Sequence, residues 1–294
     1  MAELYVDQAA GLRRLFARDS LRVVAFASGS PGVGKSVLVA NLASCLAQAG
    51  KSVLVLDEST HRTVADCFGV VPHGDLWQAI NRERSIADVL LHVFPGVQVL
   101  PAAQAVRTLG KLDGRQQKNL SDCFSALDGP VDVILVDASG DYPLGFSPLG
   151  LVAGETVIVM SPTSTSITDA YALIKKVSLG YARRNYRVLV NGVRSPGEAR
   201  AIFANIARVT HSRRFARLGF AGSVPLDMHL RQAANLCQPV ISLFPQAAAA
   251  KAFHHLACDL LGWPLPDQEP GGLEQFVEQL MQTGRHIDPV AIYA

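Results

Sequence analysis

Short apolar runs and longer amphipathic stretches alternate along most of this chain of 294 residues. Residues 22–28 form an apolar, β-prone run of the kind that is buried in a parallel sheet. In residues 36–49 the apolar positions recur at helical spacing, and Gly50 ends the stretch. The same reasoning places strands at 52–56, 97–101, 131–137, 155–160, 186–190 and 218–224, and helices at 85–93, 116–127, 166–179, 226–236 and 246–261. The pattern predicts an α/β fold, with a doubly wound, mostly parallel sheet flanked by helices.

The two ends of the chain carry amphipathic stretches outside this pattern. Residues 7–15 have apolar positions on one side, and their spacing favours a short helix that packs on the edge of the domain. Residues 263–272 are rich in proline and glycine and are expected to be a linker. We therefore divide the chain into an N-terminal segment at 1–20, a nucleotide-binding domain at 21–262, and a linker with a C-terminal helix at 263–294.

The C-terminal helix is strongly amphipathic. Its apolar positions repeat at helical spacing and are Leu273, Phe276, Val277, Leu280 and Met281. The polar face carries Glu274 and Glu278, where a helix for anionic lipid would carry lysine. Docking on its own domain or a partner and contact with a membrane therefore remain equally open.

A glycine-rich stretch lies between the first strand and the first long helix. Residues 29–36 read Gly-Ser-Pro-Gly-Val-Gly-Lys-Ser and match the phosphate-loop pattern without a mismatch. Backbone N–H groups at such a helix start can point at a phosphate, and the helix dipole adds partial positive charge. Lys35 is expected to reach the β- and γ-phosphates and the Ser36 hydroxyl to ligate Mg²⁺. The expected nucleotide contacts are Gly29, Pro31, Gly32, Val33, Gly34, Lys35, Ser36 and Val37.

Two further strands end in aspartate. Asp57 follows the second strand and Asp137 follows the run at 131–136, so both are expected at the carboxyl edge of the sheet, beside the phosphate loop. Ser36, Asp57 and Asp137 are our predicted magnesium site, and Lys35 and Asp137 are the predicted catalytic residues. The Gly- and Pro-rich residues 141–153 are expected to form a loop that senses the γ-phosphate. Ser166 and Asp169 are expected to form a capping box that opens the next helix.

Composition narrows the class of protein. Hydrophobic residues make up 49% and charged residues 18%, which describes a globular core and excludes a disordered chain. The net charge of +2 is too small for nucleic acid to be expected as the main partner. Residues 183–217 contain nine arginines and only one acidic residue, Glu198. The spacing of the arginines favours a solvated helix face over a surface for an acidic partner, lipid or nucleic acid.

The cellular compartment is also suggested by the sequence. The five cysteines are widely spaced and are expected to be buried thiols in a reducing compartment. The start lacks the pattern of a signal peptide, and no apolar run is long enough to span a membrane. We expect a cytoplasmic protein, with peripheral contact to the inner membrane left open.

Three stretches carry a resemblance to a known family. They are Asp7-Gln-Ala-x-x-Leu-Arg13, the segment 162–175 with the sequence Pro-Thr-Ser-Thr-Ser-Ile-Thr-Asp-Ala-Tyr-Ala-Leu-Ile-Lys, and the tail with Trp263-Pro-Leu-Pro266 and residues 273–280. They resemble the flagellar-number regulators FlhG/FleN, which are MinD/ParA-like P-loop ATPases. The resemblance covers nearly the whole chain.

The resemblance implies a function and partners. It implies an ATP- and Mg²⁺-binding protein that dimerises around the nucleotide, meets the inner membrane through its C-terminal helix and controls flagellar number and placement. Expected partners are the flagellar SRP-type GTPase FlhF, the flagellar transcription activator and proteins of the switch complex. The partner motif falls on Asp7, Gln8, Leu12 and Arg13, and the adenine contacts fall on Asn191 and 225–227, including Pro225 and Asp227.

This chain departs from the family pattern at the catalytic positions. Ser30 stands where the resemblance implies a signature lysine that crosses to the other subunit, and Pro31 replaces a glycine. Ser59 stands where a water-activating aspartate is implied, and it cannot act as that base. Glu58 is expected to point to the other face of the strand. Ala138 replaces a threonine. We therefore expect slow hydrolysis or binding without turnover.

Other functions remain open at this stage. One is a scaffold that has the same partners and no chemistry, with or without bound nucleotide. Another is a DNA-segregation ATPase of the ParA kind that uses the arginines at 183–217. A AAA+ motor is disfavoured because that family has Glu directly after its strand-end Asp, and here Ala138 follows Asp137.

Overall fold

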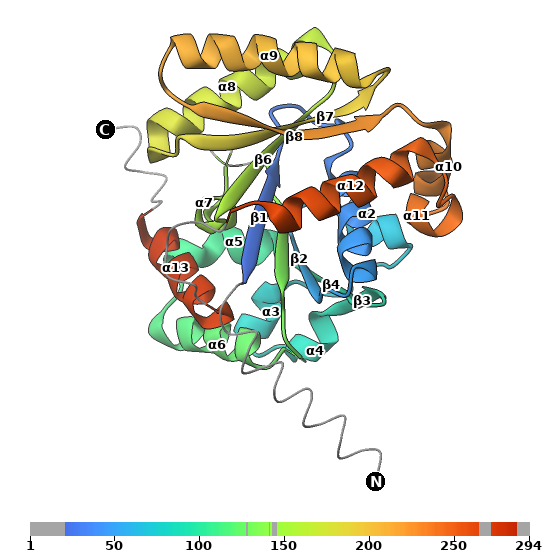
Figure 1. Cartoon of the computed structure of the whole chain (residues 1–294). Helices are drawn as coiled ribbons and strands as arrows, with labels where there is room; N and C mark the ends of the chain where they lie inside the picture. Colours follow the sequence, from blue (N-terminus) through green and yellow to red (C-terminus); the bar gives the residue numbers. More distant parts are fainter. Residues whose placement is uncertain (1–20, 128, 141, 143–145, 265–271, 287–294) are drawn as a thin grey trace.

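The computed structural model describes residues 21–127, 129–140, 142, 146–264 and 272–286. Within these residues, eight strands form one sheet in the order β3-β4-β2-β5-β1-β6-β7-β8 (Figure 1). The strands are β1 Arg22–Ala27, β2 Val53–Asp57, β3 Leu91–Phe94, β4 Val97–Pro101, β5 Val133–Asp137, β6 Glu155–Met160, β7 Asn185–Val193 and β8 Arg217–Pro225. All neighbouring pairs are parallel except β3 with β4. The predicted mostly parallel α/β sheet is confirmed.

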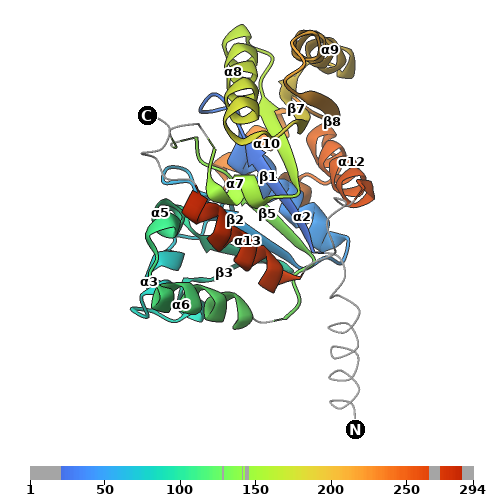
Figure 2. The same ribbon diagram turned by 90° about the vertical axis from the view of Figure 1, so that its left-hand side faces the viewer.

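Helices cover both faces of this sheet (Figure 2). They are α2 Lys35–Gln48, α3 Leu76–Ile80, α4 Ile86–Val89, α5 Ala103–Thr108, α6 Gly114–Ser125, α7 Pro148–Val152, α8 Ser164–Tyr181, α9 Pro196–Ser212, α10 Met228–Asn235, α11 Val240–Leu243, α12 Ala248–Gly262 and α13 Leu273–His286, with the 3₁₀ helices η2 Ala65–Phe68 and η3 Leu109–Lys111. Alternate strand residues belong to two core clusters, for example Leu54 and Val55. Because the central strands are buried on both faces, they appear in the sequence as continuous apolar runs.

Three of the expected elements differ in the structure, and helices α3, α5 and α9 were not among the expected elements. The helix expected at 85–93 ends at Val89, and Leu91–Phe94 instead pairs antiparallel with β4 as an edge strand. The loop expected at 141–153 contains the short helix α7, which Ser147 caps through the backbone N–H of Gly150. Helix α8 begins at Ser164 and not at 166, because Thr163 is its N-cap and accepts from the N–H of Ser166.

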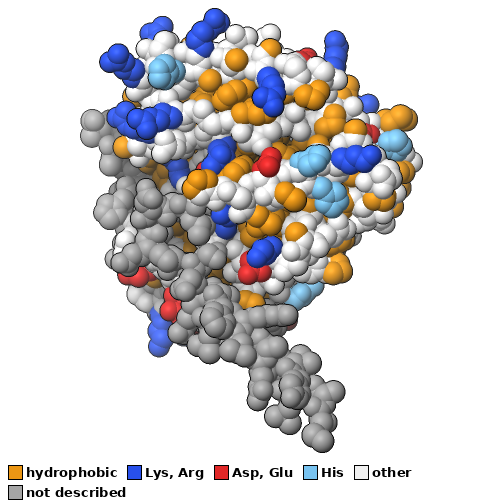
Figure 3. All heavy atoms as spheres, viewed as in Figure 1, with side chains coloured by type: hydrophobic (Ala, Val, Ile, Leu, Met, Phe, Trp, Pro, Cys, Tyr) orange, Lys and Arg blue, Asp and Glu red, His pale blue; other side chains and the backbone are white. Residues whose placement is uncertain are grey.

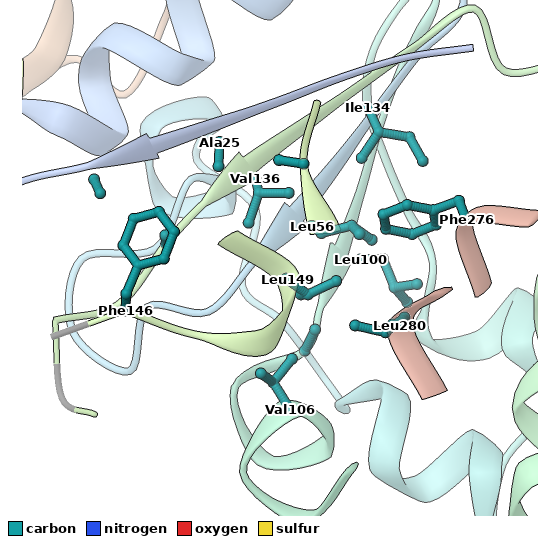
Figure 4. Packing of buried hydrophobic residues seen from close by; sticks show 14 of the residues in the cluster. Ala25, Leu56, Leu100, Val106, Ile134, Val136, Phe146, Leu149, Phe276 and Leu280 are labelled. Atoms are coloured by element: carbon teal, nitrogen blue, oxygen red, sulfur yellow. The ribbon is translucent and has the colours of Figure 1, made fainter. Parts of the chain in front are cut away.

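The C-terminal helix α13 lies against the domain (Figure 4). Phe276 and Leu280 point into the same cluster as Leu149 of α7, and Phe276 meets the ring of Phe124 of α6 edge-on with the centroids 6.2 Å apart. The exposed fractions of Phe276, Val277 and Leu280 are 4%, 1% and 1%. Of the two open possibilities, the described structure shows docking on the chain's own domain.

Two glycines allow the backbones of η3 and α13 to approach each other closely. A Cβ atom added to Gly110 of η3 would lie 2.6 Å from the carbonyl oxygen of Gly284 of α13. A Cβ atom on Gly284 would lie 3.0 Å from the Cβ atom of Leu109. The two backbones therefore cross at a distance that larger residues would prevent.

Two arginines of the 183–217 stretch have structural roles. The guanidinium of Arg183 donates to carbonyl oxygens at the end of α7, including that of Gly150 at 3.0 Å. Arg187 pairs with Glu155 at 2.9 Å and lies over the ring of Trp263, 4.0 Å from its centroid. On the face of the molecule that Figure 3 shows, the Lys and Arg side chains form separate groups with neutral and apolar atoms between them.

Candidate nucleotide-binding site

The phosphate loop needs glycine at three of its positions. Gly32 and Gly34 have φ angles of 74° and 83°, in the left-handed region that favours glycine. A Cβ atom on Gly29 would lie 2.3 Å from the backbone carbonyl of Asp169 in α8. Gly34 is the N-cap of α2, so the loop ends where the free N–H groups of that helix begin.

Three side chains converge on Asp137 at the end of β5. The Lys35 ammonium forms an ion pair with one carboxylate oxygen. The Ser36 hydroxyl donates to the other oxygen at 2.6 Å, and the Ser59 hydroxyl donates to that same oxygen at 3.1 Å. Asp137 is fully buried. The structure thus brings together the predicted lysine, serine and aspartate at the start of α2.

Asp57 is close by, and its carboxylate holds the chain that follows β2. One oxygen accepts from the N–H of Ser59 at 2.9 Å and the other from the N–H of Val64 at 2.6 Å. Burial, and then the charge of Asp137, raise the pKa of this carboxyl. Asp57 therefore fixes both ends of the 59–64 loop, and its role toward Mg²⁺ stays a prediction.

Glu58 directly follows the last residue of β2, and its carboxylate contacts the segment that follows Asp137. Its carboxylate accepts from the N–H of Ser139 at 2.9 Å and from the hydroxyl of Ser147 at 2.5 Å. It is 1% exposed, and burial raises its pKa to about 7. Glu58 thereby joins β2 to the two sides of the segment that follows Asp137, and Ser147 continues this connection into α7.

A cavity of about 780 Å³ opens over the phosphate loop. This volume lies within the range of small-molecule and cofactor sites. Beyond residues 28–37, it is lined by Ser59, Thr60, His61, Arg62, Thr63, Asp66, Cys67, Ala138, Ser139, Gly140, Ala234, Asn235 and Cys237. No local motif marks 60–67 or 234–237 in the sequence, because only the fold brings these loops to the phosphate loop.

The residues present fit a magnesium nucleotide. Mg²⁺ keeps several waters and is held by one or two protein ligands together with phosphates. Ser36 and Asp137 supply such a pair, while the described residues contain no cluster of three or more His, Cys, Asp or Glu that could hold a metal by themselves. The helix start and Lys35 supply the positive charge that phosphates require.

Comparisons with known proteins point the same way. The family model of the CobQ/CobB/MinD/ParA nucleotide binding domain matches residues 24–240. Antiactivator FleN of Pseudomonas aeruginosa is 34% identical over 274 residues, which make up 92% of this chain and 97% of FleN. This chain belongs to the MinD/ParA family and is of the FleN/FlhG type.

Two further relatives agree with this placement. The flagellum site-determining protein YlxH of Helicobacter pylori is 28% identical over 193 residues, which make up 65% of each chain. The solved structure of the MinD cell division protein of Aquifex aeolicus superposes with a TM-score of 0.63 at 25% identity and covers 83% of this chain and 98% of that chain. The fold is therefore that of MinD-type proteins.

Ser30, which stands where the family pattern implies a signature lysine, has a structural contact in this chain. The Ser30 hydroxyl donates to the Asp169 carboxylate at 2.6 Å. The loop is thus fastened to α8 of the same chain at the position where the family pattern implies a cation. Ser59 likewise donates to Asp137 where the pattern implies a carboxylate.

The residues expected at adenine lie outside the lining of the cavity. Asn191 donates from its side-chain amide to the carbonyl of Val33 at 2.7 Å and so supports the phosphate loop from β7. Asp227 caps α10 and accepts from the N–H of Ala249 at 2.9 Å. Neither they nor Pro225 are among the described residues that line the cavity, and their contact with adenine stays a prediction.

The remaining predictions concern the ends of the chain and the thiols. Asp7, Gln8, Leu12 and Arg13 lie outside the described residues. The five cysteines are free thiols. The prediction that they are buried is confirmed for Cys45 and Cys123, but Cys258 is exposed and Cys67 and Cys237 are half-buried. None of the described helices has both the length and the apolar content needed to cross a membrane.

Proposed function

We propose that this member of the FleN/FlhG type is a switch that binds ATP with Mg²⁺ and thereby controls the number or placement of flagella. The observation that carries the proposal is the meeting of Lys35 and Ser36 with Asp137 at the start of α2, beneath a cavity large enough for a nucleotide. The identity with FleN and the likeness to YlxH supply the flagellar context.

The roles of the residues follow from their chemistry. The backbone of 32–36 and the ammonium of Lys35 bind the phosphates, and Ser36 and Asp137 hold Mg²⁺, directly or through water. Bound Mg²⁺ would neutralise charge on the β- and γ-phosphates. Asp57 orders the 59–64 loop through the N–H groups of Ser59 and Val64.

Hydrolysis is expected to be slow. Of the described residues that line the cavity, Asp66 alone is acidic. Its carboxylate already accepts a hydrogen bond from the N–H of Thr63 at 2.8 Å. Glu58 is buried and turned toward Ser139 and Ser147. A residue that orients the attacking water can contribute a factor on the order of 10³ in rate. Without such a carboxylate, occupancy of the site, more than turnover, sets the state of the switch.

Nucleotide binding and turnover test this proposal. The wild-type chain should bind a fluorescent ATP analogue with Mg²⁺, and Lys35→Ala should abolish binding, while Lys251→Ala on the exposed side of α12 should behave as wild type. Absence of binding by the wild type would refute the nucleotide switch. Turnover no faster than that of Lys35→Ala, with binding intact, would favour the scaffold over the ATPase.

We further propose that the nucleotide promotes a dimer. Large apolar side chains are exposed at both ends of α10, with exposed fractions of 73% for Leu226, 76% for Met228 and 56% for Leu236. Residues 234, 235 and 237 of the same region line the cavity. Light scattering with and without an ATP analogue tests this, and a monomer under both conditions would contradict it.

The engagement of FlhF rests on the N-terminal motif. A peptide of residues 1–22 should raise the GTPase rate of the cognate GTPase, and the change Gln8→Ala should weaken the effect. An inactive wild-type peptide would remove this part of the proposal and leave the nucleotide site untouched.

A further inference from the structure

The cavity over the phosphate loop contains a positive charge that has no assigned role. Its basic lining residues are Lys35, His61 and Arg62. Lys35 is already paired with Asp137. Arg62 is exposed, and in the described part of the chain its guanidinium has no hydrogen-bond or ion-pair partner. A guanidinium beside a phosphate site, with its donors free, is chemically suited to bind phosphate oxygens.

The loop that carries Arg62 is fastened at both of its ends. Asp57 accepts from the N–H groups of Ser59 and Val64, as described above. Within the loop, the N–H of Thr63 donates to the carboxylate of Asp66 at 2.8 Å. Arg62 itself has a φ angle of 51°, in the left-handed region where a non-glycine residue is strained by roughly 1 kcal/mol. The anchored loop therefore holds Arg62 over the cavity in a defined backbone conformation.

The loop begins at the end of the cavity where a terminal phosphate and its metal belong. The Ser59 hydroxyl donates to the Asp137 oxygen that also accepts from Ser36. Residues 138–140, which directly follow Asp137, also line the cavity. Arg62 lies three residues after Ser59 in this loop and lines the same cavity. If the terminal phosphate lies beside Ser36 and Asp137, a guanidinium on this loop is near enough along the chain to reach it.

We infer that Arg62 supplies, from within the same chain, the second cationic contact to the terminal phosphate of a nucleoside triphosphate. It thereby takes the place of the lysine that Ser30 replaces, because Ser30 carries no charge and is bound to Asp169. The inference rests on the proposed function, since it requires that a nucleotide occupies the cavity. It makes the site selective for triphosphate over diphosphate without a residue from a second subunit.

The experiment compares affinities for ADP and for a non-hydrolysable ATP analogue, both with Mg²⁺, by isothermal titration of the full chain. Arg62→Gly is the main variant, because glycine accepts the left-handed backbone and leaves the loop unstrained. We expect it to bind the triphosphate at least about 10-fold more weakly, the loss typical of a charge-assisted hydrogen bond, and ADP within about 2-fold of wild type. The affinity of Arg62→Lys for the triphosphate should lie between that of wild type and that of Arg62→Gly.

The control is Arg82→Gly, which also changes an exposed arginine with a positive φ angle of 60° that pairs with Asp122 away from the cavity. It should bind both nucleotides as wild type does. Equal losses for ADP and the triphosphate, or no loss for either, would overturn the role of Arg62 while leaving the nucleotide site in place. A wild-type chain that binds neither nucleotide would overturn the proposed function, and the inference with it.

Discussion

The buried carboxyl of Glu58 should make the stability of the domain depend on pH. Burial raises its pKa from 4.5 to about 7 in the folded chain. The folded state therefore keeps a proton that the unfolded state releases between about pH 4.5 and 7. In this window the free energy of unfolding falls as pH rises, because the folded state binds more protons than the unfolded state.

The size of the effect follows from that difference. Each pKa unit corresponds to about 1.4 kcal/mol, so the range from pH 5.5 to 8 includes about 2 kcal/mol of lost stability from this one group. In Glu58→Gln the amide oxygen can accept from the N–H of Ser139 and the amide nitrogen can donate to the hydroxyl of Ser147. The variant therefore keeps both connections and removes the titration.

Urea titrations of both chains at constant ionic strength between pH 5.5 and 8 give the measurement. We expect Glu58→Gln to gain about 2 kcal/mol relative to wild type across this range. Asp57, whose pKa is also raised, titrates in both chains and cancels from the comparison. Glu83→Gln, a change of an exposed glutamate, should run parallel to wild type. Parallel profiles for Glu58→Gln and wild type would show that the Glu58 carboxyl is not held as described.

Three further changes test the packing of α13 and the phosphate loop. Phe276→Ala empties a buried site and should lower the free energy of unfolding by about 3 kcal/mol in urea; a loss under about 1 kcal/mol would show that α13 adds little to the core. Gly110→Ala puts a Cβ atom 2.6 Å from a backbone oxygen of α13 and should speed proteolysis of that helix, whereas Gly114→Ala, with no atom within 4 Å, should be cut as wild type is. Equal cleavage of the two variants would argue against the close crossing. Gly29→Ala puts a Cβ atom 2.3 Å from the backbone of α8 and should remove binding of a fluorescent ATP analogue from a folded chain, so unchanged affinity would contradict the geometry of the loop.

The sequence predicted the sheet well because the central strands are buried on both faces. Val53–Asp57 and Val133–Asp137 are buried at every position, and each is apolar up to the aspartate that ends it. The edge strand β3 was predicted as the end of a helix. None of its four residues is buried and His92 is exposed, while Ile86 and Val89 of the preceding helix α4 extend a helical spacing into it.

The candidate site was predictable where it follows one continuous stretch. Residues 29–37 and the strand-end Asp137 carry local signals, and the structure brings them together. The positions of Arg62, Asn235 and Cys237 were not predictable, because they depend on how separate loops meet across the sheet. The partners of Glu58 were hidden for the same reason, since Ser139 and Ser147 lie about 80 to 90 positions further along the chain.

The docking of α13 has a consequence for how the protein is made. The cluster that receives Phe276, Val277 and Leu280 is otherwise built from residues between 25 and 216. During synthesis these earlier residues leave the ribosome first. The apolar surface of α6, η3 and α7 that α13 covers therefore stays exposed until the last part of the chain has been synthesised. Uncovered apolar surface favours aggregation. A nascent chain stalled before residue 273 should therefore depend on chaperones more than the finished protein does.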